Sequence, residues 1–434
     1  MQHKIFLTGA GFATPFGGPT TSCLTELMLA DSTLITSTDQ YFPDRIMEYL
    51  KQKESDRDPD EFNFEHFFHA LHKMMVAGYD KSKGREARGI DILLAELISD
   101  SGIHQSMKLN WSLRTLINRP TAIWDFNKDV INNYYVAMWI QMYFEELLTK
   151  QIFKYDIGGK NEHNDIVQNF VNYIDTSFQK GKVLYRCYTL NYDYMLNKAW
   201  ESKHPTDYTD GYTLDEPLYY SDSDSPTLLF DRDSILTNSE KPAFLNLHGS
   251  VYTAYSSGAY GKQLIYPYRM KTLAREQEPK MVQDSIFYSD GRSMPPFPLI
   301  AGREKKLYIE IEPYKTYFEA LGRDIERANE LNIIGYSFSD EHVNKHIRTF
   351  LCKNEPITLI IVDWQDSRVM LKRLINATKD CPALKAFRSK CEVVAAKNSP
   401  IELNVSFSVE NISLDIHKSC ARDFINQFPQ LFPE

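Results

Sequence analysis

Strand and helix patterns alternate between residues 317 and 363, and this alternation constrains the fold more than any other feature of the chain. Apolar residues recur at helical spacing over 317–328 and 343–351, and a short apolar run follows each helical pattern, at 332–334 and 357–362. The last run is almost wholly apolar, which is typical of a strand buried on both faces. This order predicts βαβ units in a parallel sheet.

Further apolar runs extend the predicted sheet, at residues 5–7, 183–190 and 244–247. Apolar and polar residues alternate over 403–409, which predicts a half-buried strand at a sheet edge. The fold class that we predict is therefore α/β, with a Rossmann-like parallel sheet, a large helical insertion and a small C-terminal extension.

The length of 434 residues is compatible with two or three domains, or with one domain that carries a large insertion. Patterns between residues 40 and 180 are mostly helical. We therefore assign residues 1–30 and 181–380 to one discontinuous sheet domain and residues 31–180 to a helical insertion. Residues 381–434 form an extension with an edge strand and a helix.

The charge and the cysteines of the chain argue against several classes of function. Lys and Arg number 49 against 58 Asp and Glu, so direct nucleic-acid binding, which depends on neutralising phosphates, is not expected. The six cysteines form no C-x-x-C pair, and no metal site is expected. Apolar runs are too short to span a bilayer, and the first residues do not resemble a signal peptide. We expect a cytoplasmic protein without a membrane partner.

Small or polar residues follow five of the predicted strands. Ligands of an open parallel sheet bind outside the carboxyl ends of its strands, so these segments would meet at one rim. Each segment alone also fits ordinary turn or packing chemistry, and only their joint order indicates a binding site. The segments are Gly9-Ala10-Gly11, Asn191-Tyr192-Asp193, His248-Gly249, Gly335-Tyr336-Ser337 and Asp363.

The order of these segments resembles the NAD-binding core of the sirtuin family. The run Thr189-Leu190-Asn191-Tyr192-Asp193 is similar to the T-Q-N-x-D segment of that family, and Leu247-His248-Gly249 is similar to its L-H-G segment. The first glycine loop and Ile334-Gly335-Tyr336-Ser337 match the G-A-G and G-T-S segments more weakly. The resemblance covers roughly residues 3–20 and 183–375.

This resemblance implies that NAD is a substrate and that three residues are catalytic. Asn191 would hold a water or a ribose hydroxyl, and His248 would accept a proton as a general base. Asp193 would orient Asn191 or support charge nearby, and a purely structural cap is an equally weighted alternative for it.

The remaining segments would bind the dinucleotide. Gly9, Ala10, Gly11 and Phe12 would carry the pyrophosphate on backbone N–H groups, beside a helix that starts near Thr20. Residues Gly335, Ser337 and Asp363 would bind its phosphate side or its adenosine ribose.

The sequence departs from the sirtuins that deacylate proteins. Those usually carry four zinc-binding cysteines after the L-H-G segment, whereas residues 249–335 contain none here. Phe12 replaces the usual serine of the glycine loop, and the helical insertion is foreign to deacylases. The chain is similar instead to the sirtuin-like NAD-degrading proteins of bacterial antiphage defence, which often form large assemblies, some with a HerA-type ATPase.

We therefore expect an NAD+ glycohydrolase that forms nicotinamide and ADP-ribose and depletes NAD+ in antiphage defence. A homo-oligomer is expected, with a HerA-type ATPase or another defence subunit as a candidate partner. Two alternatives stay open: a zinc-free protein deacylase or ADP-ribosyltransferase, and a non-catalytic subunit that binds NAD or ADP-ribose. A nucleic-acid-processing subunit is disfavoured by the acidic charge and by the lack of a Walker loop at 258–262.

Overall fold

The computed structural model describes most of the chain. The residues that the structure describes are 2–53, 62–82, 92–109, 133–157, 161–202, 208–213, 227–237, 240–257, 265–270, 286–287, 293–294, 309–396 and 404–431.

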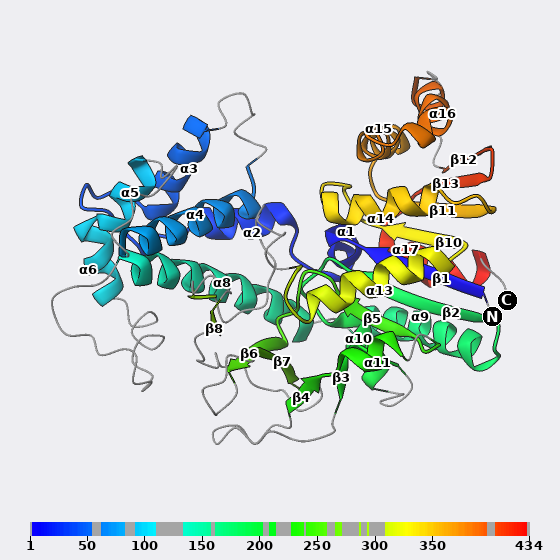
Figure 1. The fold of residues 1–434 in the computed structure, drawn as a ribbon, viewed down its shortest axis with the longest axis horizontal. Coiled ribbons are helices and arrows are strands. Elements are labelled where there is room, and N and C mark those ends of the chain that lie inside the picture. The colour runs from blue at the N-terminus through cyan, green and yellow to red at the C-terminus, as the bar shows by residue number, and fades with distance from the viewer. Residues whose placement is uncertain are drawn as a thin grey trace.

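A seven-stranded sheet organises the fold, in the spatial order β12-β13-β11-β10-β1-β2-β5 (Figure 1). All neighbouring strands are parallel except β12 and β13, which pair antiparallel. Counted along the chain, the six parallel strands have the order 3-2-1-4-5-6, which is the doubly wound Rossmann order. The strands are β1 (Gln2–Thr8), β2 (Val183–Thr189), β5 (Ala243–Asn246), β10 (Glu330–Ile334), β11 (Ile357–Asp363), β12 (Asn404–Val409) and β13 (Ile412–Lys418).

This arrangement confirms the predicted α/β class and the parallel sheet. β12 lies at the sheet edge, as the alternation over 403–409 predicts, and its half-buried residues alternate with exposed ones. The sequence did not predict its partner β13.

Helices cover both faces of the sheet because side chains of successive strand residues point to opposite sides. Ile5 and Leu7 of β1 pack in the cluster beneath α13 (Tyr314–Arg327), α14 (Glu341–Leu351) and α15 (Ser367–Ala377). Phe6 between them packs in the opposite cluster. That second cluster contains residues of α9 (Asn161–Gln179), α10 (Met195–Glu201) and α17 (Ala421–Leu431).

A separate helical bundle lies at one end of the molecule, away from most of the sheet (Figure 1). Its core is rich in aromatic side chains, among them Phe42, Phe67 and Phe144. Its helices are α2 (Thr21–Leu29), α3 (Phe42–Lys53), α4 (Phe64–Ser82), α5 (Ile92–Ser99), α6 (Ser101–Leu109) and α8 (Asn133–Ile157). The helix α9 also falls in the predicted insertion 31–180, yet it packs against β2 and α17. The predicted domain boundaries themselves stay a prediction.

Short elements complete the described chain. A four-stranded antiparallel sheet has the order β3-β4-β7-β6, and β8 pairs with β9. The sequence analysis predicted neither. The elements are β3 (Tyr212–Thr213), β4 (Thr227–Phe230), β6 (Thr253–Ser257), β7 (Ile265–Met270), β8 (Ile286–Phe287), β9 (Ser293–Met294), α1 (Ala10–Ala13), α11 (Arg232–Leu236) and α16 (Lys385–Ala396).

Among the helices in the described part of the chain, none combines the length and the apolar character that crossing a membrane requires.

A buried ion pair fastens α13 to the sheet. Arg186 of β2 donates from Nε to Oδ2 of Asp324 over 2.7 Å, and both side chains are at most 5% exposed. The hydroxyl of Tyr188 donates to the same oxygen over 2.6 Å. A guanidinium in this position is stabilised only while the carboxylate faces it, because burial removes the water that would otherwise solvate the charge.

We predict that Asp324→Ala lowers the free energy of unfolding by about 3–5 kcal/mol, because it leaves the charge of Arg186 buried without its partner. Glu319→Ala, on the same helix, is the control: its ion pair with Arg232 is about half exposed, and its loss should cost at most about 1 kcal/mol. Urea unfolding of both variants measures the difference, and equal losses would contradict the assigned role of the buried pair.

A carboxyl group is buried inside the helical bundle. Glu145 of α8 is 2% exposed and accepts a hydrogen bond from Nε2 of Gln141 over 3.0 Å. Burial raises the pKa of Glu145 from 4.5 to about 8, and the bond from Gln141 only partly opposes this rise. The folded state therefore retains the proton of Glu145 at a pH where the unfolded chain has lost it.

This raised pKa predicts a pH-dependent stability. Below pH 4.5 Glu145 is protonated in both states and does not lower the free energy of unfolding. Between pH 4.5 and pH 8 Glu145 ionises in the unfolded chain but not in the folded protein. The free energy of unfolding therefore falls with rising pH, by at most about 5 kcal/mol. Glu145→Gln, which cannot ionise, should reduce this fall when urea unfolding is compared at pH 5 and pH 8. Glu146→Gln is the control, since Glu146 pairs with Lys150 at the surface. Identical pH dependence of wild type and Glu145→Gln would refute the assignment.

Candidate functional site

A cavity of about 480 Å³ opens at the carboxyl ends of the parallel strands. Its walls come from the segments after β1, β2, β5, β10 and β11, and from α2, α4 and α8 of the helical bundle. Nine of the ten predicted site residues line it, namely Gly9, Ala10, Gly11, Asn191, Asp193, His248, Gly335, Ser337 and Asp363. Five segments that are far apart in the sequence therefore meet at one rim, as the sequence analysis expected.

The glycines at the end of β1 allow two backbone segments to approach closely. A Cβ on Gly9 would lie 2.6 Å from the carbonyl oxygen of Gly335, and a Cβ on Gly11 would lie 2.8 Å from Cα of Gly335. Gly335 itself has φ +63°, and a Cβ there would lie 2.4 Å from backbone atoms of Gly11 and Phe12. The contact occurs between β1 and β10, where the strand order reverses.

This contact gives the glycine loop a structural role in addition to the expected one. The N–H of Gly9 donates to Ile334, that of Gly11 donates to Gly335, and that of Phe12 donates to Gly9, over 2.9–3.0 Å. Three N–H groups that we expected to face a pyrophosphate are therefore bonded within the protein. The glycines are needed first for the junction of β1 and β10.

The side chain of Phe12, a residue whose backbone N–H was the expected ligand contact, does not line the cavity. It is 2% exposed and packs against Phe16, in the cluster that lies under α9 and α17. Phe12 thus holds the start of α1 on the sheet, and its side chain does not contact a ligand in the cavity.

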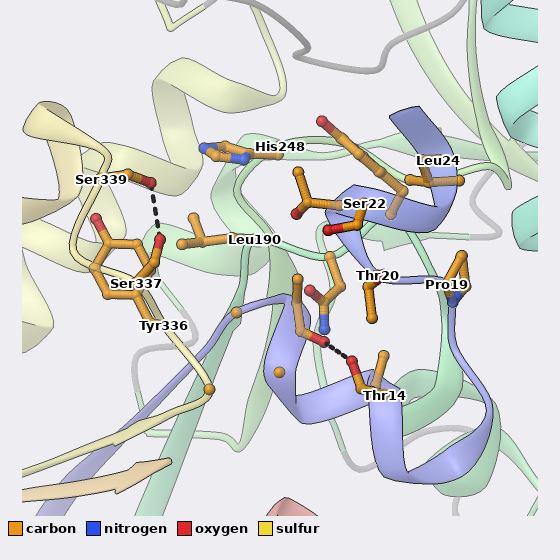
Figure 2. A pocket seen from close by; sticks show the side chains of 18 of the residues that line it. Thr14, Pro19, Thr20, Ser22, Leu24, Leu190, His248, Tyr336, Ser337 and Ser339 are labelled. Carbon is orange, nitrogen blue, oxygen red and sulfur yellow. Dashed lines mark hydrogen bonds between the residues drawn. The ribbon is translucent and has the colours of Figure 1, made fainter. Parts of the chain in front are cut away.

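The start of α2 supplies a polar wall. Oγ1 of Thr20 accepts the N–H of Cys23 over 3.0 Å and caps the helix, which confirms the helix start that the sequence predicts near Thr20. Thr20, Thr21 and Ser22 line the cavity. Figure 2 shows Thr20 and Ser22 across the cavity from Ser337 and Ser339, whose hydroxyls lie 2.9 Å apart.

Asn191 is held by its backbone, and its side chain amide faces the cavity wall. The side chain of Asn246, at the end of β5, donates to the carbonyl oxygens of Asn191 and Asp193 over 3.2 and 2.8 Å. Asn191 is 8% exposed, and its Nδ2 has no hydrogen-bond partner among the residues that the structure describes. A buried donor without a partner at a cavity wall is a position where a bound ligand would supply the missing acceptor.

Asp193 has a structural role in addition to its place at the cavity. Its Oδ1 accepts the N–H of Met195 over 3.1 Å at the start of α10. The cap that the sequence analysis weighed for Asp193 is therefore present. Its carboxylate also lines the cavity, so it adds negative charge there.

His248 faces a carboxylate that sequence reasoning did not single out. Its Nε2 lies 3.0 Å from Oδ2 of Asp340, and both side chains are at most 6% exposed. Asp340 caps α14, because its Oδ1 accepts the N–H of His342 over 3.0 Å. An imidazole that contacts a carboxylate on one side is held in orientation, and its protonated form is stabilised.

The cavity is predominantly acidic. Of the described residues that line it, Glu65, Asp193, Asp340 and Asp363 are acidic, and Arg373 is basic. Burial raises the pKa of the Tyr192 phenol well above its ordinary value, and nearby carboxylates, among them Glu65 and Asp340, raise it further. The end of the cavity around His248 therefore favours a positive charge over a negative one.

Asp363 ends β11, as the sequence analysis expected. Its Oδ1 accepts the N–H of Gln365 over 2.9 Å, so part of the carboxylate stabilises its own turn. Burial raises the pKa of Asp363, while bonds from the backbone of Gln365 and Trp364 oppose the rise. Trp364 beside it is 64% exposed and also lines the cavity.

The sequence analysis missed the residues that reach the cavity from the helical bundle. Phe64 and Glu65 come from α4, and Ile152 and Tyr155 come from α8. No motif marks them, because they meet the sheet only through tertiary packing. Asp340 had a weak signal, since it follows Ser337 closely and precedes a helical pattern as a capping residue does.

In the described part of the chain, no group of His, Cys, Asp and Glu side chains has the arrangement of a metal site.

Comparison with known proteins connects this site to one family. Residues 186–378 match the family model of the SIR2-like domain. No curated protein matches the chain. The matched range contains the second half of β2, all of β5, β10 and β11, and Asn191, His248 and Asp340. The match supports a sirtuin-like protein, and it is consistent with NAD-related chemistry because SIR2-like domains use NAD.

The junction of the two glycine loops predicts unequal effects of two similar substitutions. Gly335 and Gly181 both have positive φ, but a Cβ on Gly181 would meet nothing within 4 Å. Gly181→Ala should lower the free energy of unfolding by about 1–2 kcal/mol, because it causes backbone strain alone. Gly335→Ala should cost about 1–3 kcal/mol more, because the backbone of Gly11 must move. Urea unfolding compares the variants, and equal losses would show that the loops do not depend on this contact.

Proposed function

We propose that the protein is an NAD+ glycohydrolase, which cleaves the bond between nicotinamide and ribose and forms nicotinamide and ADP-ribose. The observation that carries the proposal is that Asn191 and His248, 57 positions apart in the chain, line one cavity at the carboxyl ends of β2 and β5. The SIR2-like match over residues 186–378 supports NAD as the substrate. The cavity volume of about 480 Å³ lies within the usual range of ligand sites.

The lining residues suggest how the substrate would be oriented. The nicotinamide ribose is assigned to the end that carries Asn191 and His248. The pyrophosphate is assigned to the start of α2, since a helix N-terminus with hydroxyl side chains favours an anion. The adenosine is then assigned to the end with Asp363 and Trp364.

The acidic surroundings of His248 support cleavage of a glycosidic bond. When the C–N bond breaks, its electron pair leaves with nicotinamide, which becomes neutral, and positive charge develops on the ribose. Carboxylates such as Glu65 and Asp193 stabilise that charge through the low dielectric of the cavity. The same carboxylates would disfavour a reaction that builds negative charge at this end.

Water then completes the reaction. Asn191 orients the water or a ribose hydroxyl through its side chain amide, and His248 accepts the proton that the water loses when it adds to the ribose. The products are nicotinamide, ADP-ribose and one proton. General-base assistance of this kind contributes on the order of 10²–10⁴ to the rate.

Two other functions of the same site give different results in solution. A zinc-free deacylase or ADP-ribosyltransferase would release nicotinamide only when an acyl-lysine or an acceptor protein is added. A non-catalytic regulatory subunit would bind NAD or ADP-ribose without releasing nicotinamide. The presence of His248 in the same cavity as Asn191 favours the hydrolase, since binding alone does not require a base at this position.

The biological setting that we propose follows the resemblance stated for the sequence. The protein would deplete NAD+ during antiphage defence, and it would act as a homo-oligomer or with a HerA-type ATPase. Nicotinamide release with and without such a partner tests this setting, and loss of phage protection in the His248→Ala variant would support it.

We predict that purified protein releases nicotinamide from NAD+, and that Asn191→Ala and His248→Ala each lower the rate by about 10²-fold or more. Release is followed by chromatography or with a fluorescent NAD+ analogue. His417→Gln, on β13 beside the edge strand and outside the cavity, is the matched histidine control and should retain the wild-type rate.

The control for folding is the thermal unfolding midpoint, which should be similar in all four proteins. Variants that lose activity only because they unfold would contradict the catalytic roles. If the isolated chain is inactive, slower growth of cells that express wild type, but not of cells that express His248→Ala, would still support the proposal.

A further inference from the structure

The loop between β10 and α14 places one carboxylate against the imidazole of His248. Oδ2 of Asp340 lies 3.0 Å from Nε2 of His248, and that nitrogen is buried. The ring lies between the loop of Ser337 and Ser339 and the start of α2 (Figure 2). The carboxylate of Asp340 thus lies against the imidazole where it borders the cavity.

The loop that carries Asp340 is held by several independent bonds. The hydroxyl of Tyr336 accepts the backbone N–H of Asp340 over 3.0 Å. The same hydroxyl donates to the backbone carbonyl oxygen of Asp340 or to Oδ1 of Asn344. The side chain of Asn344 donates to the carbonyl oxygen of Phe338 over 2.9 Å. Phe338 has φ +60°, a left-handed conformation that a bulky residue adopts only where its surroundings impose it.

The carboxylate itself is also fixed in direction. Its Oδ1 accepts the N–H of His342, which leaves Oδ2 directed at His248. A helix cap alone would be satisfied by Asn, Ser or Thr, none of which carries charge. The position of Oδ2 is therefore a feature that the capping role does not require.

We propose that Asp340 is a positioning residue for His248: its buried carboxylate holds the imidazole in place and stabilises the imidazolium that forms when the ring accepts a proton. This inference rests on the proposed function for its catalytic meaning, but the basicity of His248 can be measured without any substrate. A carboxylate at this distance stabilises the imidazolium that forms when the base accepts a proton.

The other ionisable groups that line the cavity also influence the pKa of His248. The experiment compares variants in order to separate their influence from that of Asp340. Those that line the cavity around it come from α4, α8, α15 and the segments after β2, β10 and β11: Glu65, Tyr155, Tyr192, Asp193, Tyr336, Asp363 and Arg373. Only Asp340 is changed in the test, so the contribution of the remaining groups is common to all proteins compared.

The test is an NMR pH titration of the histidine side chains in ¹⁵N-labelled protein, with Asp340→Asn and Asp366→Asn. Both substitutions keep a helix cap, because Asn caps as well as Asp, and Asp366 caps α15 as Asp340 caps α14. In Asp340→Asn the pKa of His248 should fall by about one unit or more, because the amide does not stabilise the imidazolium as the carboxylate does. Asp366→Asn should match wild type.

An unchanged pKa of His248 in Asp340→Asn would overturn the proposal, whatever the enzyme does. The kinetic arm uses NAD+: Asp340→Asn should lower kcat by about tenfold or more at pH 7, with little change in KM, and it should shift the acidic limb of the pH–rate profile to lower pH. A change confined to KM would also contradict the proposed role. Absence of nicotinamide release from the purified wild type, together with equal growth of cells that express wild type and His248→Ala, would refute the proposed function alone if the NMR result is intact.

Discussion

The close approach of two backbone segments between β1 and β10 is the constraint on which the cavity depends. Gly9 and Gly11 on one side and Gly335 on the other leave no space for a Cβ, and backbone bonds join them. β1 and β10 can therefore remain paired up to their carboxyl ends, and the segments that follow the two strands then move apart. The cavity occupies the space that this divergence opens, with α2 and the bundle closing it.

Around this junction, the side chains that hold the loops are largely the ones that face the cavity. Asp193 caps α10, Asp340 caps α14, and Asp363 closes its own turn. Each carboxylate thus satisfies backbone donors on one side and contributes negative charge to the cavity on the other. The carboxylates that stabilise the loops are thus also the ones that make the surroundings of His248 acidic. Such an environment suits a reaction that develops positive charge.

The glycine loop has a structural role that its local sequence pattern does not show. A glycine pair after a strand is typical of a phosphate-binding turn, and the residues do line the cavity. Their N–H groups, however, are bonded to the segment after β10 and to the loop itself. The identity of that partner depends on which strand lies beside β1, and the local pattern of glycines does not contain this information.

The sequence alone determined the α/β class, the edge strand and nine lining residues, because apolar periodicity and the small residues at strand ends are local properties of the chain. Tertiary structure decided the rest. The pairing of His248 with Asp340, the burial of Phe12 and the contribution of Glu65 all join elements that are distant in sequence. These contacts follow from strand order and helix packing, and no residue type or spacing specifies which side chain meets which across a folded core.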